Sequence, residues 1–137
     1  MPAYIAGLDP SEPFAVLADA TRTAGSLGIV VCTWRAAQTP PPHSMPRTDQ
    51  AFLVLAGACV LTVDGDERPV GIGDLAFVPR GSPVAVRVTA GPCRVLVVLA
   101  PAGPEAYLAT ASALPGMSPT TLISLAADHG VVIHHSP

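Results

Sequence analysis

Residues 73–84 read Gly-Asp-Leu-Ala-Phe-Val-Pro-Arg-Gly-Ser-Pro-Val. The segment begins with a Gly-Asp turn, continues as the apolar run Leu75–Val78, and turns again through the Pro- and Gly-rich residues 79–83. Glycine tolerates the positive φ of a tight corner, while proline fixes φ and cannot donate to a strand ladder. The pattern therefore predicts a short strand held between two tight turns.

Further short strands are expected on both sides of this one. Apolar, alternating or β-branched runs are bounded by turn signals, such as Asp64-Gly65-Asp66. The runs that predict strands cover residues 27–37, 49–55, 58–63, 68–72, 84–88 and 93–100. Strands of this length and spacing favour a closed antiparallel barrel or a sandwich.

Two motifs carry a family resemblance. The pattern Gly-x5-Pro-x-Gly from Gly73 to Gly81 resembles the second motif of the cupins, and residues 42–57 resemble the first, with six residues between Gln50 and Gly57. The resemblance implies an all-β fold, a cupin-type antiparallel β-barrel (double-stranded β-helix or jelly roll) with a short C-terminal helical extension. The chain is similar to the small single-domain, quercetinase-like cupins, and this similarity implies that it forms a homodimer.

The chain is expected to form one domain in three parts. Residues 1–26 form an N-terminal arm, residues 27–104 the cupin barrel, and residues 105–137 the helical extension. Within the arm, residues 13–20 suit either a short helix or an edge strand. In the extension, residues 105–113 and 119–130 predict helices, the second with hydroxyl residues and a proline near its start and a glycine at its end, and residues 130–133 a short strand.

The metal ligands of the family are mostly absent. A typical cupin holds a divalent metal with three His and one Glu, and His43 occupies the first of these positions. Met45, Gln50 and Val84 stand at the other three. An amide and an isopropyl group cannot supply the charge and donor strength of carboxylate and imidazole ligands. We therefore predict no metal and no cofactor, and a metal-dependent dioxygenase with ligands recruited from elsewhere is the alternative.

What remains is an apolar barrel with few polar groups, the composition of a small-molecule site. The resemblance places His43 and Gln50 in the interior, with His43 as catalytic acid or base and Gln50 as the partner of the substrate oxygen. The expected substrate-binding residues are Met45, Phe52, Val54, Phe77, Val84, Val86 and Arg35, although Arg35 equally suits a solvent-facing position. These residues suggest a metal-independent isomerase or cyclase acting on an apolar, ketide-like or aromatic molecule. A non-catalytic small-molecule binding protein is a further alternative, in which His43 is only a remnant of a metal site.

The composition and charge of the chain exclude some classes of binding partner. The net charge is −3, and the seven cationic side chains, all Arg, are dispersed along the sequence, which argues against nucleic-acid binding. No apolar run approaches the roughly 18 residues of a membrane span, and no secretory signal is evident, so a cytoplasmic location is expected. Cys32, Cys59 and Cys93 lie within expected strands and are predicted to be buried thiols rather than a disulfide or zinc set.

Overall fold

Strands make up most of the ordered structure. The computed structural model describes residues 2–114 and 116–134. The strands are β1 (Phe14–Ala18), β2 (Gly28–Trp34), β3 (His43–Ser44), β4 (Asp49–Val63), β5 (Asp66–Val70), β6 (Leu75–Val78), β7 (Val84–Ala100) and β8 (Val132–Ile133), and the helices are α1 (Glu105–Ala113) and α2 (Pro119–Asp128). Every strand pairing is antiparallel, as the sequence predicts for this cupin-type architecture.

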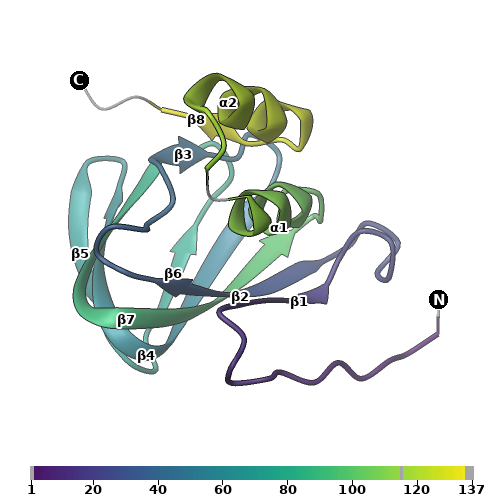
Figure 1. The fold of residues 1–137 in the computed structure, drawn as a ribbon, viewed down its shortest axis with the longest axis horizontal. Coiled ribbons are helices and arrows are strands. Elements are labelled where there is room, and N and C mark those ends of the chain that lie inside the picture. Colours follow the sequence, from purple (N-terminus) through teal and green to yellow (C-terminus); the bar gives the residue numbers. More distant parts are fainter. Residues whose placement is uncertain (1, 115, 135–137) are drawn as a thin grey trace.

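Two long strands, β4 and β7, organise the sheet because each belongs to both of its halves. Residues 49–54 of β4 pair with residues 95–100 of β7, and residues 59–63 of β4 pair with residues 84–88 of β7. One half runs β6–β4–β7–β2–β1 and the other runs β5–β4–β7–β3–β8. We refer to them as the β1 half and the β8 half (Figure 1).

The crossing from one half to the other is marked by irregular pairing. The register between β4 and β7 shifts between Val54 and Cys59, on either side of Gly57. Gly57 has φ of 73°, a conformation that glycine adopts without steric cost. The sequence predicted two strands here, and two more in place of β7. In the structure, β4 and β7 are each one continuous strand that bends at the irregular pairing. A β-bulge can change the direction of a strand without ending it.

The core lies between the inner faces of the two halves. Burial alternates along β4 and β7, and the inward positions of β2 add further apolar side chains, including Val30 and Trp34. The rings of Trp34 and Phe52 lie 6.0 Å apart at a tilted angle. The three cysteines are buried free thiols, as predicted, and burial raises the pKa of Cys32 to about 12.

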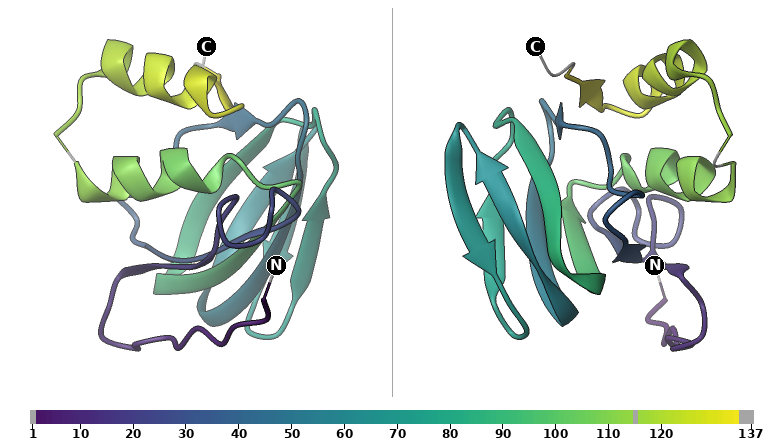
Figure 2. Two further views of the ribbon diagram at one scale, coloured as in Figure 1. Left: turned by 90° about the vertical axis from the view of Figure 1, so that its right-hand side faces the viewer. Right: turned by 60° about the vertical axis from the view of Figure 1, so that its left-hand side comes forward.

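The two helices close one side of the barrel. In both figures they lie on the side of the molecule away from β5 (Figures 1 and 2). Tyr107 of α1, Ala126 of α2 and Val131 before β8 join the main core. Ser118 caps α2 by accepting a hydrogen bond from the backbone N–H of Thr121, with a proline at the next position, which agrees with the start signal in the sequence. No helix among the described residues is long and apolar enough to span a membrane.

The open question about the N-terminal arm is settled in favour of a strand. Phe14–Ala18 forms β1, which pairs with β2 at the edge of the β1 half. Phe14 and Val16 pack against the core. The arm is therefore anchored to the barrel by residues 14–18.

Candidate functional site

His43 and Gln50 approach each other from opposite halves of the sheet. His43 lies on β3, paired with Val84 of β7 and Ile133 of β8, and Gln50 lies near the start of β4. His43 Nε2 is 3.3 Å from Gln50 Oε1, and the two residues are 6% and 2% exposed. They form a polar contact inside a largely apolar core.

The partners of the imidazole determine where its proton lies. Nδ1 is 2.9 Å from the carbonyl oxygen of Pro41, and because a carbonyl only accepts, Nδ1–H is the donor. Burial lowers the pKa of His43 below its ordinary value of 6.5, outweighing the hydrogen bonds to Pro41 and Gln50 that raise it. The ring is thus neutral near pH 7 with a lone pair on Nε2. Gln50 satisfies that lone pair when its amide turns so that the NH₂ group faces the ring.

The rest of the expected ligand set does not fit a metal ion. Met45 and Val84 are each 1% exposed and belong to the apolar core. Among the residues that the structure describes, no group of three or more His, Cys, Asp or Glu side chains is placed to hold a metal. A thioether, an amide and an isopropyl group beside one imidazole offer too little charge for a hard divalent cation.

Most predicted substrate-binding residues face the interior. Met45, Phe52, Val54 and Val84 are fully buried in the core, and Val86 is partly buried against it. Their side chains fill much of the barrel interior instead of lining an empty one. They could contact a substrate only where the packing opens.

Two predicted residues lie outside the barrel. Phe77 is 61% exposed, because it pairs with Ala51 on the outward face of β4, whereas its neighbours Ala76 and Val78 face inward. Arg35 is exposed just beyond the end of β2, in a tight turn closed by a bridge to Gln38. The expectation that Phe77 lines the barrel interior is therefore wrong, and Arg35 takes the solvent-facing position that the sequence also allowed.

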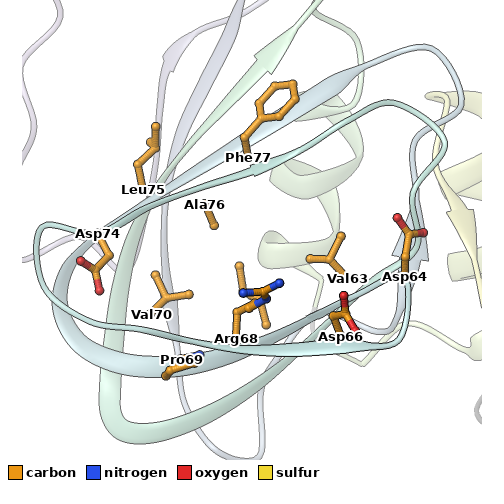
Figure 3. A pocket seen from close by; sticks show the side chains of 11 residues that line it. Val63, Asp64, Asp66, Arg68, Pro69, Val70, Asp74, Leu75, Ala76 and Phe77 are labelled. Carbon is orange, nitrogen blue, oxygen red and sulfur yellow. The ribbon is translucent and has the colours of Figure 1, made fainter.

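A pocket opens between the edge strands β5 and β6 (Figure 3). Its volume is about 540 Å³. Leu61, Val63 and Val70 give it an apolar floor, and Asp66 and Arg68 stand on the same inward face of β5 as Val70. Its lining residues belong to β4, β5 and β6 and to the turns beside them, on strands that Figure 1 shows together.

The sequence-based prediction missed Asp66 and Arg68. It began the strand at Arg68 and gave neither residue a role. The signal was the alternation of Asp66, Arg68 and Val70, which puts three side chains of one parity on the inner face. The exposed Phe77 also lines this pocket, at its β6 wall.

His43 does not line this pocket, although only one strand separates it from the pocket floor. Val63, in the pocket floor, pairs with Val84, and Val84 pairs with His43. A second pocket of about 300 Å³ lies between the start of the helical extension and the end of α2, and it includes Arg47 and His129. Neither His43 nor Gln50 lines either pocket.

Comparisons with known proteins agree with this architecture. Residues 30–99 match a family model described as "Cupin domain". A search of curated proteins found no match. KdgF from Halomonas sp. superposes with a TM-score of 0.63 at 18% identity, over 77% of this chain and 99% of that one, which is evidence for the fold alone.

Two other solved structures share more sequence. An RmlC-like cupin protein from Desulfovibrio desulfuricans is 27% identical with a TM-score of 0.54, over 64% of this chain and 80% of that one. The polyketide cyclase RemF from Streptomyces resistomycificus is 26% identical with a TM-score of 0.54. That match covers 64% of this chain and 63% of RemF, so the chain spans somewhat less than two thirds of RemF.

Proposed function

This chain belongs to the cupin family, and from that premise we propose that it is a metal-independent enzyme that moves a proton on a small, mostly apolar carbonyl compound. The substrate enters between β5 and β6, and His43 is the acid and base. The reaction class is isomerisation or cyclisation through an enolate. Each part of the proposal rests on a separate feature of the barrel.

The orientation of His43 carries the proposal. The carbonyl oxygen of Pro41 holds Nδ1–H, so the lone pair of Nε2 points toward Gln50 and can accept a proton once a substrate displaces the contact with the amide. A general base whose second nitrogen is fixed by a backbone carbonyl is a common catalytic arrangement. The lowered pKa keeps the ring in its basic form at neutral pH.

Gln50 supports the same proton transfer by stabilising the oxygen of the enolate. When Nε2 takes a proton from the carbon next to a carbonyl, the C–H electron pair moves into the C–O system and forms an enolate. Once a substrate has displaced the contact with Nε2, the amide N–H of Gln50 can donate to that oxygen as charge develops. Return of the proton from the imidazolium to another carbon completes an isomerisation, so no oxidant or reductant is consumed.

Access to His43 from the pocket requires movement of Val84. Val84 lies between the floor of the pocket and His43 in the strand ladder and is 1% exposed. Val86 and Val88, the next inward positions of β7, are only partly buried, which indicates looser packing on this side of the interior. A substrate that enters from the pocket would displace Val84 to reach Nε2.

The choice of substrate class draws on sequence likeness as well as on the site. RemF is a polyketide cyclase and shares 26% identity with this chain. The apolar floor of the pocket and the polar pair His43 and Gln50 suit a ketide-like or aromatic carbonyl compound. No metal enters the proposed reaction, because the side chains at the family's ligand positions do not fit one.

Deuterium exchange tests the proposal without knowledge of the natural substrate. The probe is 6-hydroxy-1-tetralone in D₂O, and NMR follows exchange at the carbon next to its carbonyl. We expect the protein to accelerate exchange, His43→Gln to abolish the acceleration, and His129→Gln to retain it. Dialysis against a chelator should leave the rate unchanged. Equal rates for the wild type and His43→Gln, or loss of activity with the chelator, would refute the proposal.

A non-catalytic binding protein is the second candidate, and one observation favours it. His43 has both ring nitrogens occupied and is 6% exposed, so in this conformation it meets no ligand in either pocket. Under this function the probe binds, its carbon protons do not exchange faster, and His43→Gln changes the affinity little. The same experiment therefore separates the two candidates.

A further inference from the structure

We propose that Arg68 and Asp66 form the recognition site of the pocket between β5 and β6, and that its ligand is an uncharged apolar molecule carrying a carbonyl and a hydroxyl group. This inference rests on the proposed function because it takes the pocket as the entrance to the same interior. It adds the residues that select the substrate and the chemical class that they select.

The positions of the two charged residues are the first observation. Asp66 pairs with Val63 and Arg68 with Leu61, whose side chains lie in the pocket floor, so both charges project from the inner face of β5 (Figure 3). Residues two apart on one strand are separated by about 6.8 Å, and both point the same way. A donor and an acceptor thus stand side by side on the wall of a largely apolar pocket.

Arg68 is available to a ligand. The ion pairs among the described residues are Arg22 with Asp19 and Arg80 with Asp49, so the guanidinium of Arg68 has no carboxylate partner there. No protein hydrogen bond from it is present among those residues either. A guanidinium offers five N–H donors in a planar fork and accepts nothing, so it suits a carbonyl oxygen.

The charge balance of the pocket argues against an anionic ligand. Asp64, Asp66 and Asp74 all line it, against Arg68 as its one lining cation. Asp64 accepts from the Ser82 hydroxyl, and Asp74 accepts from the backbone N–H of Gly71, so these two have structural partners. Asp66 remains to accept a hydrogen bond from a ligand hydroxyl. A carboxylate ligand would be repelled by the excess negative charge, whereas a hydroxy-ketone satisfies Arg68 and Asp66 without that cost.

The size of the pocket agrees with a small molecule. Its volume of about 540 Å³ lies within the usual range for small-molecule sites. Its floor of Leu61, Val63 and Val70 and its wall at Ala76 would cover the apolar body of a bicyclic aromatic compound. The competing explanation is that inward charges on an edge strand only prevent strand pairing between molecules.

Titration by NMR tests this site directly. The probe 6-hydroxy-1-tetralone has its two oxygens at opposite ends of the molecule, and 1-naphthoate is the anionic comparison of similar size. We expect the tetralone to shift backbone signals of β5 and β6 and to bind more tightly than the naphthoate. Arg68→Gln should weaken tetralone binding about tenfold or more, because a hydrogen bond to a charged group is lost. Asp66→Asn should weaken it less, since an amide still offers an acceptor.

Arg87→Gln is the matched control, since Arg87 is exposed on β7 and lines neither pocket. Equal effects of Arg68→Gln and Arg87→Gln, no tetralone binding, tighter binding of naphthoate, or signal shifts confined to other strands would each overturn the inference. The outcome is separable from that for the proposed function. Exchange that persists unchanged in Arg68→Gln overturns the inference alone, whereas Arg68-dependent binding without exchange overturns the proposed function alone.

Discussion

His43 on β3 and Gln50 on β4 join the two halves of the sheet through a contact of 3.3 Å between Nε2 and the side-chain amide. Met45, two residues after His43, and Val84, the ladder partner of His43, are apolar and fully buried. The protonation state of His43 is therefore tied to the stability of the barrel as well as to the proposed chemistry.

The first prediction concerns pH. Burial lowers the pKa of His43 in the folded protein below the value of 6.5 expected when unfolded. The unfolded chain therefore binds a proton more readily, and stability that is present above pH 6.5 declines as the pH falls toward the folded pKa. Urea unfolding at a series of pH values should show this decline in the free energy of unfolding for the wild type and for His129→Gln. In His43→Gln the free energy of unfolding should depend less on pH. Parallel curves for all three proteins would contradict the prediction.

The second prediction concerns Gln50. Gln50→Glu places a carboxylate beside Nε2, and a nearby negative charge favours the protonated imidazole, so the pKa of His43 should rise. Titration of the ring carbon signals by NMR measures the change. The control is Asp49→Asn, next in sequence, which removes a half-buried carboxylate that pairs with Arg80 and should leave the titration of His43 in place. A His43 pKa that falls or stays constant in Gln50→Glu would show that the two side chains do not interact as described.

The sequence predicted the architecture because its signals are local. The turns on both sides of β6 and the capped start of α2 depend on residues adjacent in the chain, and these elements were predicted with correct or nearly correct bounds. The continuity of β4 and β7 was missed, because Gly57 and the segment near residue 91 resemble turns in isolation. Only the pairing between the two strands keeps both ladders running through the bend.

The site was predicted in part for the same reason. The motif positions of His43 and Gln50 were enough to predict that both face the interior, but whether the interior is filled depends on the packing of many distant side chains. The error at Phe77 was avoidable, since the alternation of Leu75–Val78 allows only one pair to face inward. The alternation of Asp66, Arg68 and Val70 places Arg68 on the inner face, but the pocket on which its proposed role depends is visible only in the structure.

The third prediction tests the bend in β4. A β-carbon on Gly57 would clash with the backbone oxygens of Ala90 and Pro92, and the φ of 73° is itself unfavourable for alanine. Gly57→Ala should therefore lower the free energy of unfolding by about 3 kcal/mol or more, from strain and overpacking together. Gly65→Ala is the control, because its φ is 86° but nothing lies within 4 Å of the added carbon. It should cost only about 1 kcal/mol, and equal losses in urea unfolding would argue against tight packing at Gly57.

The fourth prediction concerns Glu105, which ties the helical extension to the barrel. Its carboxylate accepts hydrogen bonds from the backbone N–H groups of Ala20, at 3.0 Å, and Gly103, at 2.6 Å, and the residue is 3% exposed. Glu105→Ala leaves both donors without their partner and should destabilise the protein by about 2–4 kcal/mol. Glu105→Gln should lower the stability less than Glu105→Ala does. An amide keeps one accepting oxygen, but its NH₂ group would face the other donor.

Glu67→Ala provides the comparison for Glu105, since Glu67 is exposed on β5 and its loss should change stability by less than about 0.5 kcal/mol. Urea unfolding gives the free energies, and amide hydrogen exchange at Ala20 and Gly103 reports the two bonds directly. Faster exchange at both sites in Glu105→Ala, with the centre of β4 still protected, would show that the carboxylate fastens the extension locally. Unchanged exchange at these amides would mean that packing of Tyr107 and Ala126 against the core holds the helices without it.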